Sequence, residues 1–417
     1  MSKTGPVSQS ERLGSLDFLR GIAVLGILMI NIGSYSYPNP FHAYAFGFED
    51  ALDRDARFWI YLFFQGKFFS IFALLFGVGF YIFLERMEVR DIGLRGMDVF
   101  ARRLFWLFVF GAIHAIFIWH GDILYHYATC GLLLFPFRSF KTPYLFSVVL
   151  VIMVTLSYRT YQSTIIRAEK LQAYTEAIKT EEAGRSDDQQ KAIETWIKIT
   201  TISKPDGEPT VHARIGGYWS NVQENLTHVD IASGQVFYAG IMLRTLMLMM
   251  IGILMYRLQI FSNYQSIPYY WLITVVVLAL GLWMNYVRCY HWTYEHYDKP
   301  IINEVEALSL LFYKEVLAIG YILLFNGLYQ KWLSSFSRNP LVSVGRMALT
   351  NYISQSVICV FIFYGFGFGL FNQWSRSELI VVVLFVWGFQ MIFSMLWLKW
   401  YQWGPLEALW RKLTYKL

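Results

Sequence analysis

The stretch that decides the fold class lies near the C-terminal end of the chain, at residues 379–398, and reads LIVVVLFVWGFQMIFSMLWL. It holds no charged residue, and its length matches the roughly 20 apolar residues that an α-helix needs to cross a bilayer. Nine other apolar runs are spaced along the chain, so we expect about ten transmembrane helices. The ten runs cover approximately 16–35, 58–83, 102–119, 122–137, 143–160, 235–256, 268–288, 306–328, 342–370 and 378–400.

The composition agrees with a membrane protein. Hydrophobic residues make up 56% of the 417 residues and charged residues only 15%, whereas soluble proteins carry roughly 25% charged residues. This excludes a cytosolic enzyme, a disordered chain and a secreted disulfide scaffold. Cys130, Cys289 and Cys359 are far apart in the sequence, so we expect no disulfide framework. The net charge of +6 indicates membrane orientation and contact with anionic lipid, not nucleic-acid binding.

Lys and Arg are concentrated in the loops that would share a side with the N-terminus, and such loops stay in the cytoplasm. The sequence therefore predicts an all-α, polytopic bundle with both termini cytoplasmic. Two runs are atypical. The run at 122–137 is short, so a re-entrant segment is an alternative to a full span. The run at 342–370 carries Gly365, Gly367 and Gly369, where we expect a kink or a packing contact.

A polar segment separates two apolar halves. Apolar residues recur at helical spacing within it, which predicts a helical extracytoplasmic insertion; a solvated linker is the alternative. We therefore expect an N-terminal five-helix half at 1–160, the insertion at 161–234, and a C-terminal five-helix half with a basic cytoplasmic tail at 235–417.

Asp17 and Arg20 stand at the start of the first apolar run, three residues apart. This spacing puts them on one helix face, where they can form an ion pair. Gly21, Ala23 and Gly26 follow, and small residues at such positions let another helix approach closely. The pair is therefore either an anchor at the membrane interface or part of a binding site.

Three further basic residues, Lys67, Arg244 and Lys314, lie within apolar runs. A charged side chain at the bilayer centre costs about 2.5–3.5 kcal/mol on insertion scales, so each needs a partner or a cavity. Three buried cations in one bundle predict a site for an anionic guest such as a phosphate or a carboxylate. Glu306 and Glu315 are alternative partners within the bundle, and Arg244 has no acidic residue in its own run.

His114 and Asp122 flank a short turn between two runs, at the predicted outer side. A carboxylate that orients an imidazole makes a general base near neutral pH. The alternative is that Asp122 only caps the following helix. With His120, the two residues match no strong zinc motif, so we expect no metal. The motifs of metalloproteases, serine hydrolases and P-loop proteins are absent.

Three stretches together resemble the YeiB family of bacterial inner-membrane proteins, a domain of unknown function. The first is LDFLRGIAVLGI at 16–27, continuing to Asn31. The second is His114 with Trp119, GDIL at 121–124 and Gly131. The third is GRMALTNY at 345–352, with GPLE at 404–407 and Trp410-Arg411. The likeness runs from end to end, except for residues 161–234, and it implies a multi-pass protein of the bacterial cytoplasmic membrane.

The opening also resembles heparan-α-glucosaminide N-acetyltransferase and, more loosely, the acyltransferase-3 proteins. Those enzymes move an acyl group from cytosolic acyl-coenzyme A to an acceptor beyond the membrane. In the glucosaminide enzyme an Asn ends the first span and the catalytic His follows in the loop; Asn31 and His42 stand in the corresponding places here. Acyltransferase-3 proteins carry a His where this chain has Asn31, which leaves the base open between His42 and His114.

The resemblance implies a transmembrane acyltransferase that uses acyl-coenzyme A, with acetyl-coenzyme A as the expected donor. Arg20, Lys67, Arg244 and Lys314 would contact the donor, and His114, Asp122, His42 and Asn31 would act on an acceptor hydroxyl or amine. The expected partners are this donor, a glycan, lipid or small-molecule acceptor and membrane lipids, and a homodimer stays open. The alternatives are a transporter or channel for a small organic anion, and a non-catalytic scaffold.

Overall fold

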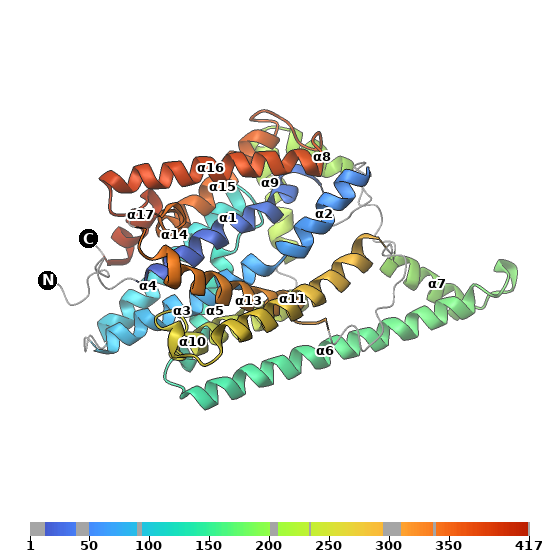
Figure 1. Cartoon of the computed structure of the whole chain (residues 1–417). Helices are drawn as coiled ribbons and strands as arrows, with labels where there is room; N and C mark the ends of the chain where they lie inside the picture. The colour runs from blue at the N-terminus through green and yellow to red at the C-terminus, as the bar shows by residue number, and fades with distance from the viewer. Residues whose placement is uncertain are drawn as a thin grey trace.

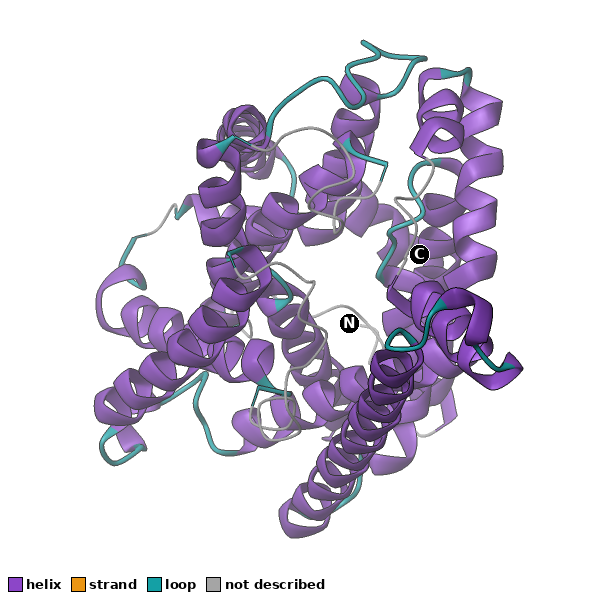
Figure 2. Ribbon diagram, turned by 90° about the vertical axis from the view of Figure 1, so that its right-hand side faces the viewer, coloured by secondary structure: helices purple, strands orange, loops and turns teal. Residues whose placement is uncertain are grey.

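A computed structural model describes residues 13–38, 50–89, 94–200, 207–232, 235–294, 310–336 and 339–415. Every regular element in these ranges is helical, which confirms the all-α class (Figure 2). Eight helices among the described residues are long and apolar enough to cross a membrane, or nine if the bent pair α14–α15 is one span. The chain is therefore a polytopic membrane protein. The expected number of ten spans and the cytoplasmic termini stay predictions.

The main helices follow the predicted runs. They are α1 (Gly14–Ser36), α2 (Ala51–Phe63), α3 (Lys67–Val89), α4 (Leu94–Phe117), α5 (Leu124–Leu134), α6 (Thr142–Ala177), α7 (Asp187–Thr200), α8 (Gly207–Ile215), α9 (Tyr218–Ala232), α10 (Gln235–Arg257), α11 (Tyr270–Thr293), α13 (Tyr313–Leu328), α14 (Pro340–Arg346), α15 (Ala348–Phe363), α16 (Arg376–Trp400) and α17 (Pro405–Tyr415).

The long helices lie side by side in an elongated bundle (Figure 1). α1 packs on α14 and α3 on α10, so segments from the two halves of the sequence pack against each other, while α11 packs on α13 within the C-terminal half. α1 begins and α17 ends at one end, which we call the terminus end. At the opposite end, the cap end, α8 and α9 cover the bundle and are called the cap. α6 continues past the bundle toward α7 (Figure 1).

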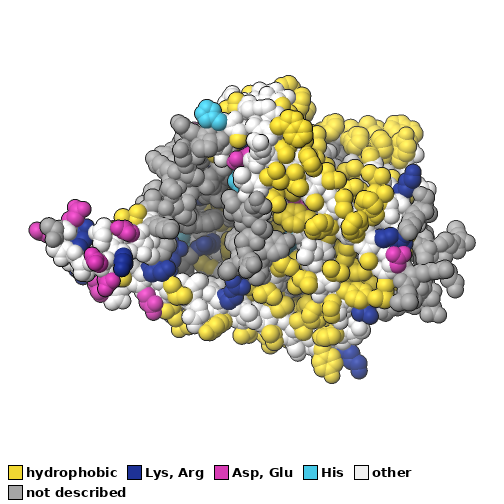
Figure 3. Space-filling view, turned by 180° about the vertical axis from the view of Figure 1, so that it is seen from behind, with side chains coloured by type: hydrophobic (Ala, Val, Ile, Leu, Met, Phe, Trp, Pro, Cys, Tyr) yellow, Lys and Arg dark blue, Asp and Glu magenta, His cyan; other side chains and the backbone are white. Residues whose placement is uncertain are grey.

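The surface of the bundle matches a lipid environment. Apolar side chains dominate the face seen in Figure 3, while acidic and basic side chains gather mainly at the projecting end that belongs to α6 and α7. Large apolar residues such as Phe385 on α16 and Val151 on α6 are 75% and 63% exposed. Exposed apolar patches of this extent are expected where lipid, and not water, covers the helices.

The contact between α1 and α14 is as close as the glycines of α1 suggest. A Cβ atom on Gly21 would lie 1.9 Å from the carbonyl oxygen of Leu341, and one on Gly345 would lie 1.7 Å from that of Asp17. Because no side chain fits there, glycine is required at both positions. The contact fixes Arg20 on α1 and Arg346 on α14 next to each other in the fold.

The run at 342–370 breaks at a different place from the one its glycines suggested. α14 and α15 meet at an angle of 89° around Met347, and α15 ends at Phe363, before the glycines. The bend is stabilised from α17, because Glu407 accepts hydrogen bonds from the free backbone N–H groups of Leu349 and Thr350 at 2.7 and 3.0 Å. The glycines serve packing instead: a Cβ on Gly365 would lie 1.7 Å from the carbonyl oxygen of Ile215 in the cap.

Two other segments clarify the predicted organisation. The run at 122–137 contains an α-helix of only 11 residues, α5, which is too short to cross a bilayer alone. α6 is one continuous helix of 36 residues that passes through the expected boundary at residue 160. The polar insertion thus begins inside a helix, and the three-part division of the chain stays a prediction.

Candidate functional site

A buried chain of hydrogen bonds connects four side chains near the cap end. His114 Nδ1 lies 2.7 Å from Asp122 Oδ2, and His114 Nε2 lies 2.7 Å from Ser356 Oγ. Ser356 Oγ lies 2.6 Å from the hydroxyl of Tyr35. None of the four residues is more than 7% exposed, and the side chain of Asp122 is fully buried. The network therefore joins α4, the α4–α5 turn, α15 and α1.

Asp122 fills both roles that its sequence position allowed. Its Oδ1 accepts from the backbone N–H groups of Leu124 and Tyr125 at 2.7 and 3.0 Å and so caps α5, while Oδ2 holds His114. Gly111 makes this possible, because a Cβ there would lie 2.6 Å from Asp122 Oδ1.

The hydrogen bonds of the network have a consistent donor-to-acceptor order when Asp122 accepts from Nδ1–H of His114. Nε2 then directs its lone pair at Ser356. The Ser356 hydroxyl then donates to Nε2 and accepts from the Tyr35 hydroxyl. The order of serine, histidine and aspartate in this network resembles the hydrogen-bonding order of a hydrolase triad. Sequence reasoning found His114 and Asp122 but missed Ser356 and Tyr35, which lie 242 and 79 residues from His114 in apolar runs and carry no motif.

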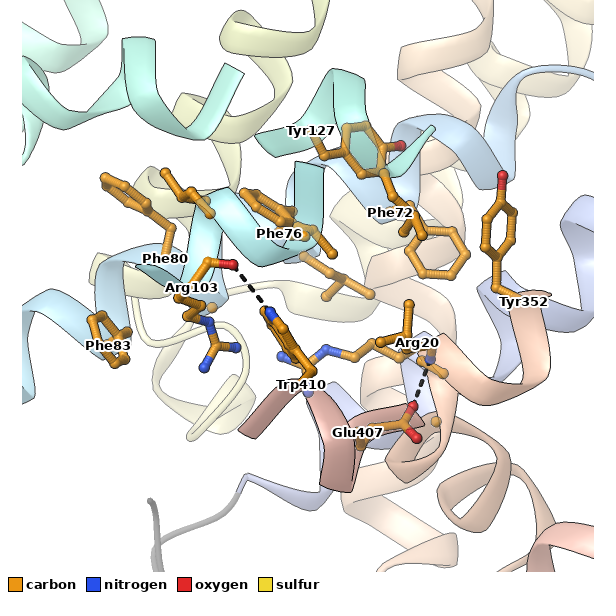
Figure 4. Close-up of a pocket in the computed structure, with 18 of the residues that line it drawn as sticks. Arg20, Phe72, Phe76, Phe80, Phe83, Arg103, Tyr127, Tyr352, Glu407 and Trp410 are labelled. Carbon is orange, nitrogen blue, oxygen red and sulfur yellow. Dashed lines mark hydrogen bonds between the residues drawn. The ribbon is translucent and has the colours of Figure 1, made fainter. Parts of the chain in front are cut away.

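A cavity of about 260 Å³ opens at the terminus end (Figure 4). Four arginines, Arg20, Arg103, Arg346 and Arg411, line it against two acidic residues, Asp17 and Glu407. The rest of the lining is mostly apolar and aromatic, including Phe72, Phe76, Phe80, Phe83, Tyr127, Tyr352, Trp403 and Trp410. A positively charged mouth above an apolar interior suits a ligand with a charged head and an apolar tail.

The charges at the mouth are partly engaged within the protein. Arg20 pairs with Asp17 at 2.7 Å, as their spacing predicted. Arg346 donates to the backbone of Gln402 at 3.1 Å, but its Nε is buried and finds no hydrogen-bond partner among the described residues. Burial raises the pKa of the Glu407 carboxyl, although hydrogen bonds from Thr350 and Leu349 oppose the shift. The mouth therefore has an excess of positive charge and an N–H group available to an anion.

Tyr352 connects the cavity to the hydrogen-bond network. It lines the cavity (Figure 4), and its ring centroid lies 5.3 Å from that of His114. Its hydroxyl accepts from the backbone N–H of Ile123 and donates to the carbonyl of Gly121, the residues on either side of Asp122. One layer of side chains thus separates the cavity from His114 and Asp122.

The other predicted donor-binding residues gather elsewhere. Lys67 is fully buried and its Nζ donates to the carbonyl of Tyr61 at 2.7 Å. Arg244 forms an ion pair with Glu315 at 2.5 Å, the partner that the sequence offered as an alternative to an anionic guest. Lys314 lies beside the ring of Tyr313, as Lys67 does. None of these three lines the cavity, whereas Arg20 does.

The two remaining predicted residues have different outcomes. Asn31 is half-buried on α1, four residues before Tyr35, so both side chains share one helix face next to the network. His42 lies outside the described residues. The choice of His42 as the base therefore stays a prediction, while His114 stands in a geometry suited to that role.

A second polar cluster holds the cap on the bundle. Arg214 of α8 is 2% exposed and donates to Asn225 Oδ1 at 2.8 Å, with His120 Nδ1 3.1 Å away. The rings of His120 and His228 stack at 4.2 Å. Burial lowers the pKa of both histidines, and the neighbouring Arg214 lowers both further. The cluster is directly connected to the network, because His120 follows Trp119, which packs on Tyr35.

Residues 255–417 match the family model described as Protein of unknown function (DUF418). The chain is 31% identical to Uncharacterized protein YxaH of Bacillus subtilis (strain 168), over 100% of this chain and 97% of that protein. It is 30% identical to Uncharacterized protein YeiB of Escherichia coli (strain K12), over 97% of this chain and 96% of that protein. No solved structure matches the chain.

Proposed function

The chain belongs to the YeiB-like DUF418 family, and from this premise we propose that it is a transmembrane acyltransferase. It would take an acyl group, with acetyl as the first candidate, from cytosolic acyl-coenzyme A and deliver it to an extracytoplasmic hydroxyl or amine. The acceptor would be a glycan, a lipid or a small molecule. The protein would lie in the bacterial cytoplasmic membrane with the terminus end in the cytoplasm.

The observation that carries the proposal is the line from the arginine-lined cavity, through Tyr352, to His114 and Asp122. Acyl-coenzyme A has a diphosphate, a 3′-phosphate and an adenine at one end and a thioester at the end of a flexible arm. Arg20, Arg103, Arg346 and Arg411 suit the phosphates, since arginine forms bidentate hydrogen bonds to such groups. Trp403 and Trp410 lie at the same mouth, where Arg411 and Arg103 stack over their rings.

His114 would supply the proton transfers that acyl transfer requires, with Asp122 holding the imidazole in the reactive tautomer. Asn31 would polarise the acyl carbonyl from its place on α1. The apolar lining around Phe72 and Phe76 would exclude water, which otherwise competes with the acceptor for the acyl group. Donor and acceptor would then meet near the cap end without either crossing the whole membrane.

Thermal unfolding of the detergent-purified protein tests the donor site. A ligand at 100 times its dissociation constant stabilises the folded state by about 2.7 kcal/mol, so saturating acetyl-coenzyme A should raise the Tm of the wild type. The double variant Arg20→Gln/Arg103→Gln should lose the increase. Arg159→Gln, which removes an exposed arginine of α6 far from the cavity, should keep it.

The contrary result is equally clear. If acetyl-coenzyme A, longer acyl-coenzyme A and free coenzyme A all leave the Tm unchanged, the donor site does not exist and the proposal fails. Flux of a small organic anion into proteoliposomes without coenzyme A would then establish transport in its place.

A further inference from the structure

Neither ring nitrogen of His114 is open to the cavity. Nδ1 is held by Asp122, and Nε2 is occupied by the hydroxyl of Ser356 at 2.7 Å. Because both nitrogens are engaged, and His114 and Ser356 are only 1% and 0% exposed, an acceptor cannot give its proton to His114 while Ser356 stays in place. The first group that His114 can deprotonate is therefore Ser356.

The partners of Ser356 also set it apart from hydroxyl residues that bond to their own helix. Ser147, Thr155 and Thr274 each donate back to the carbonyl four residues earlier, which is the usual bond of such side chains in helices. Ser356 instead is hydrogen-bonded to His114 and Tyr35, from two other helices. These tertiary contacts hold the hydroxyl against an imidazole that can accept its proton, as a nucleophilic serine requires.

We propose that Ser356 is the nucleophile of a two-step transfer and carries the acyl group as an ester between donor and acceptor. The inference rests on the proposed function, because it needs an acyl donor in the cavity. Tyr35 is a positioning residue that holds the Ser356 hydroxyl toward His114.

Both steps balance. In the first, Ser356 Oγ gives its proton to His114 Nε2 and bonds to the thioester carbonyl carbon. The carbon–sulfur bond breaks, and His114 returns the proton to the departing sulfur, so that free coenzyme A leaves. In the second, the acceptor hydroxyl or amine gives its proton to His114 and attacks the ester carbon. Ser356 Oγ leaves and recovers the proton from His114. No oxidant or further reactant is required.

A two-step transfer through Ser356 fits the position of the network between the two ends of the protein. On one side Tyr352 separates His114 from the cavity at the terminus end. On the other side Tyr35 packs on Trp119, next to the cap, with ring centroids 4.2 Å apart. An ester on Ser356 lets coenzyme A depart toward one end before the acceptor enters from the other, so the two substrates need not occupy the buried site together.

Isotope exchange without an acceptor tests the inference directly. A covalent intermediate makes the first step reversible by itself, so the wild type should transfer radiolabel from free coenzyme A into acetyl-coenzyme A. Ser356→Ala should reduce the exchange rate by at least 100-fold while keeping the increase in Tm with acetyl-coenzyme A. Ser354→Ala lies on the same helix, where the hydroxyl donates to the carbonyl of Asn351 and accepts from Gln390 Nε2, and this variant should exchange at the wild-type rate.

Mass spectrometry of the wild type after incubation with acetyl-coenzyme A should find one acetyl group on the peptide that contains Ser356. If Ser356→Ala does not fold, Ser356→Cys replaces it, and its acetyl group should become labile to neutral hydroxylamine as a thioester. Exchange at the wild-type rate in Ser356→Ala overturns the inference. Donor binding without exchange in the wild type also overturns it and leaves the proposed function standing, whereas absence of donor binding removes the proposed function itself.

Discussion

Two basic regions of this membrane bundle look alike in the sequence and behave differently in the structure. At the terminus end, Arg20, Arg346 and their neighbours face a cavity. Within the helices α3, α10 and α13, Lys67 is bonded to a carbonyl and Arg244 to Glu315, without access to that cavity. A buried cation thus indicates a ligand only where the protein leaves it both space and unused hydrogen-bonding capacity.

The difference has a physical cause. A cation deep in the membrane must be neutralised at all times, since leaving it unpaired costs several kcal/mol. Glu315 meets that need for Arg244, whose side chain is 27% exposed. The arginines of the cavity are half-buried as well, with the side chain of Arg20 30% exposed, but they line a space that a phosphate can enter. Ligand binding is therefore expected at the cavity, and structural pairing where an acidic partner takes the place of a ligand.

The largest expected effect comes from breaking the interior pair. Glu315→Gln leaves Arg244 without its partner, and removing one member of a buried ion pair should lower the free energy of unfolding by about 2 kcal/mol, given that Arg244 is partly exposed. Denaturation in detergent measures the loss. Glu194→Gln on α7, an exposed carboxylate, is the matched control. A large loss of affinity for acetyl-coenzyme A with unchanged stability would contradict this distinction, because it would make Arg244 and Glu315 part of the ligand site.

The second expected effect is at the cavity, where a substitution should weaken ligand binding and leave the stability nearly unchanged. Arg346→Gln removes a buried Nε–H that has no partner among the described residues, so stability should change little. A charged hydrogen bond to a phosphate contributes about 1.5–3 kcal/mol, so the affinity for acetyl-coenzyme A should fall by about 10- to 100-fold in a calorimetric titration. The parallel variant Lys314→Gln, outside the cavity, should bind within threefold of the wild type. Equal losses in both variants would contradict the distinction.

The sequence predicts contacts that are local and misses those that depend on tertiary packing. Asp17 and Arg20 share a helix face, and His114 and Asp122 are separated by one turn, so their pairing follows from spacing. The membrane spans follow from apolar length alone. Ser356 lies 242 residues from His114 within an apolar run, and no local pattern distinguishes it from a serine that bonds to its own helix.

The bend around Met347 shows the same limit. The glycines at 365–369 are a local signal for a break, but the chain bends where Glu407, 57 residues away, accepts the free N–H groups at the start of α15. The cavity is another case, because Arg103, Arg346 and Arg411 lie far apart in the sequence, where their positive charge indicates only membrane orientation. They line one cavity only when α4, α14 and α17 are brought together.

The smallest expected effect extends the comparison to the cap end, where Arg214 is fully engaged by Asn225 and His120, as Arg244 is by Glu315. Here we expect Arg214 and its partners to stabilise the docking of the cap on the bundle, and not to bind a ligand. His120 and His228 have lowered pKa values in the folded protein, chiefly through burial. As the pH falls, these histidines are therefore protonated in the unfolded state before they are protonated in the folded state. The stability that they contribute is complete above the unfolded pKa of about 6.5, and the free energy of unfolding decreases as the pH falls below that value.

Hydrogen exchange measures this decline locally. Protection of the amides of α8 and α9 should fall severalfold between pH 7.5 and pH 5.5, while protection in α1 and α16 stays constant. His228→Gln should reduce the pH dependence, because the group that is stacked on His120 no longer titrates. His212→Gln, an exposed histidine on the same cap, should retain it. Equal pH dependence in the wild type and His228→Gln would mean that the cap is held mainly by its contact with Gly365 and that the Arg214 cluster contributes little to docking.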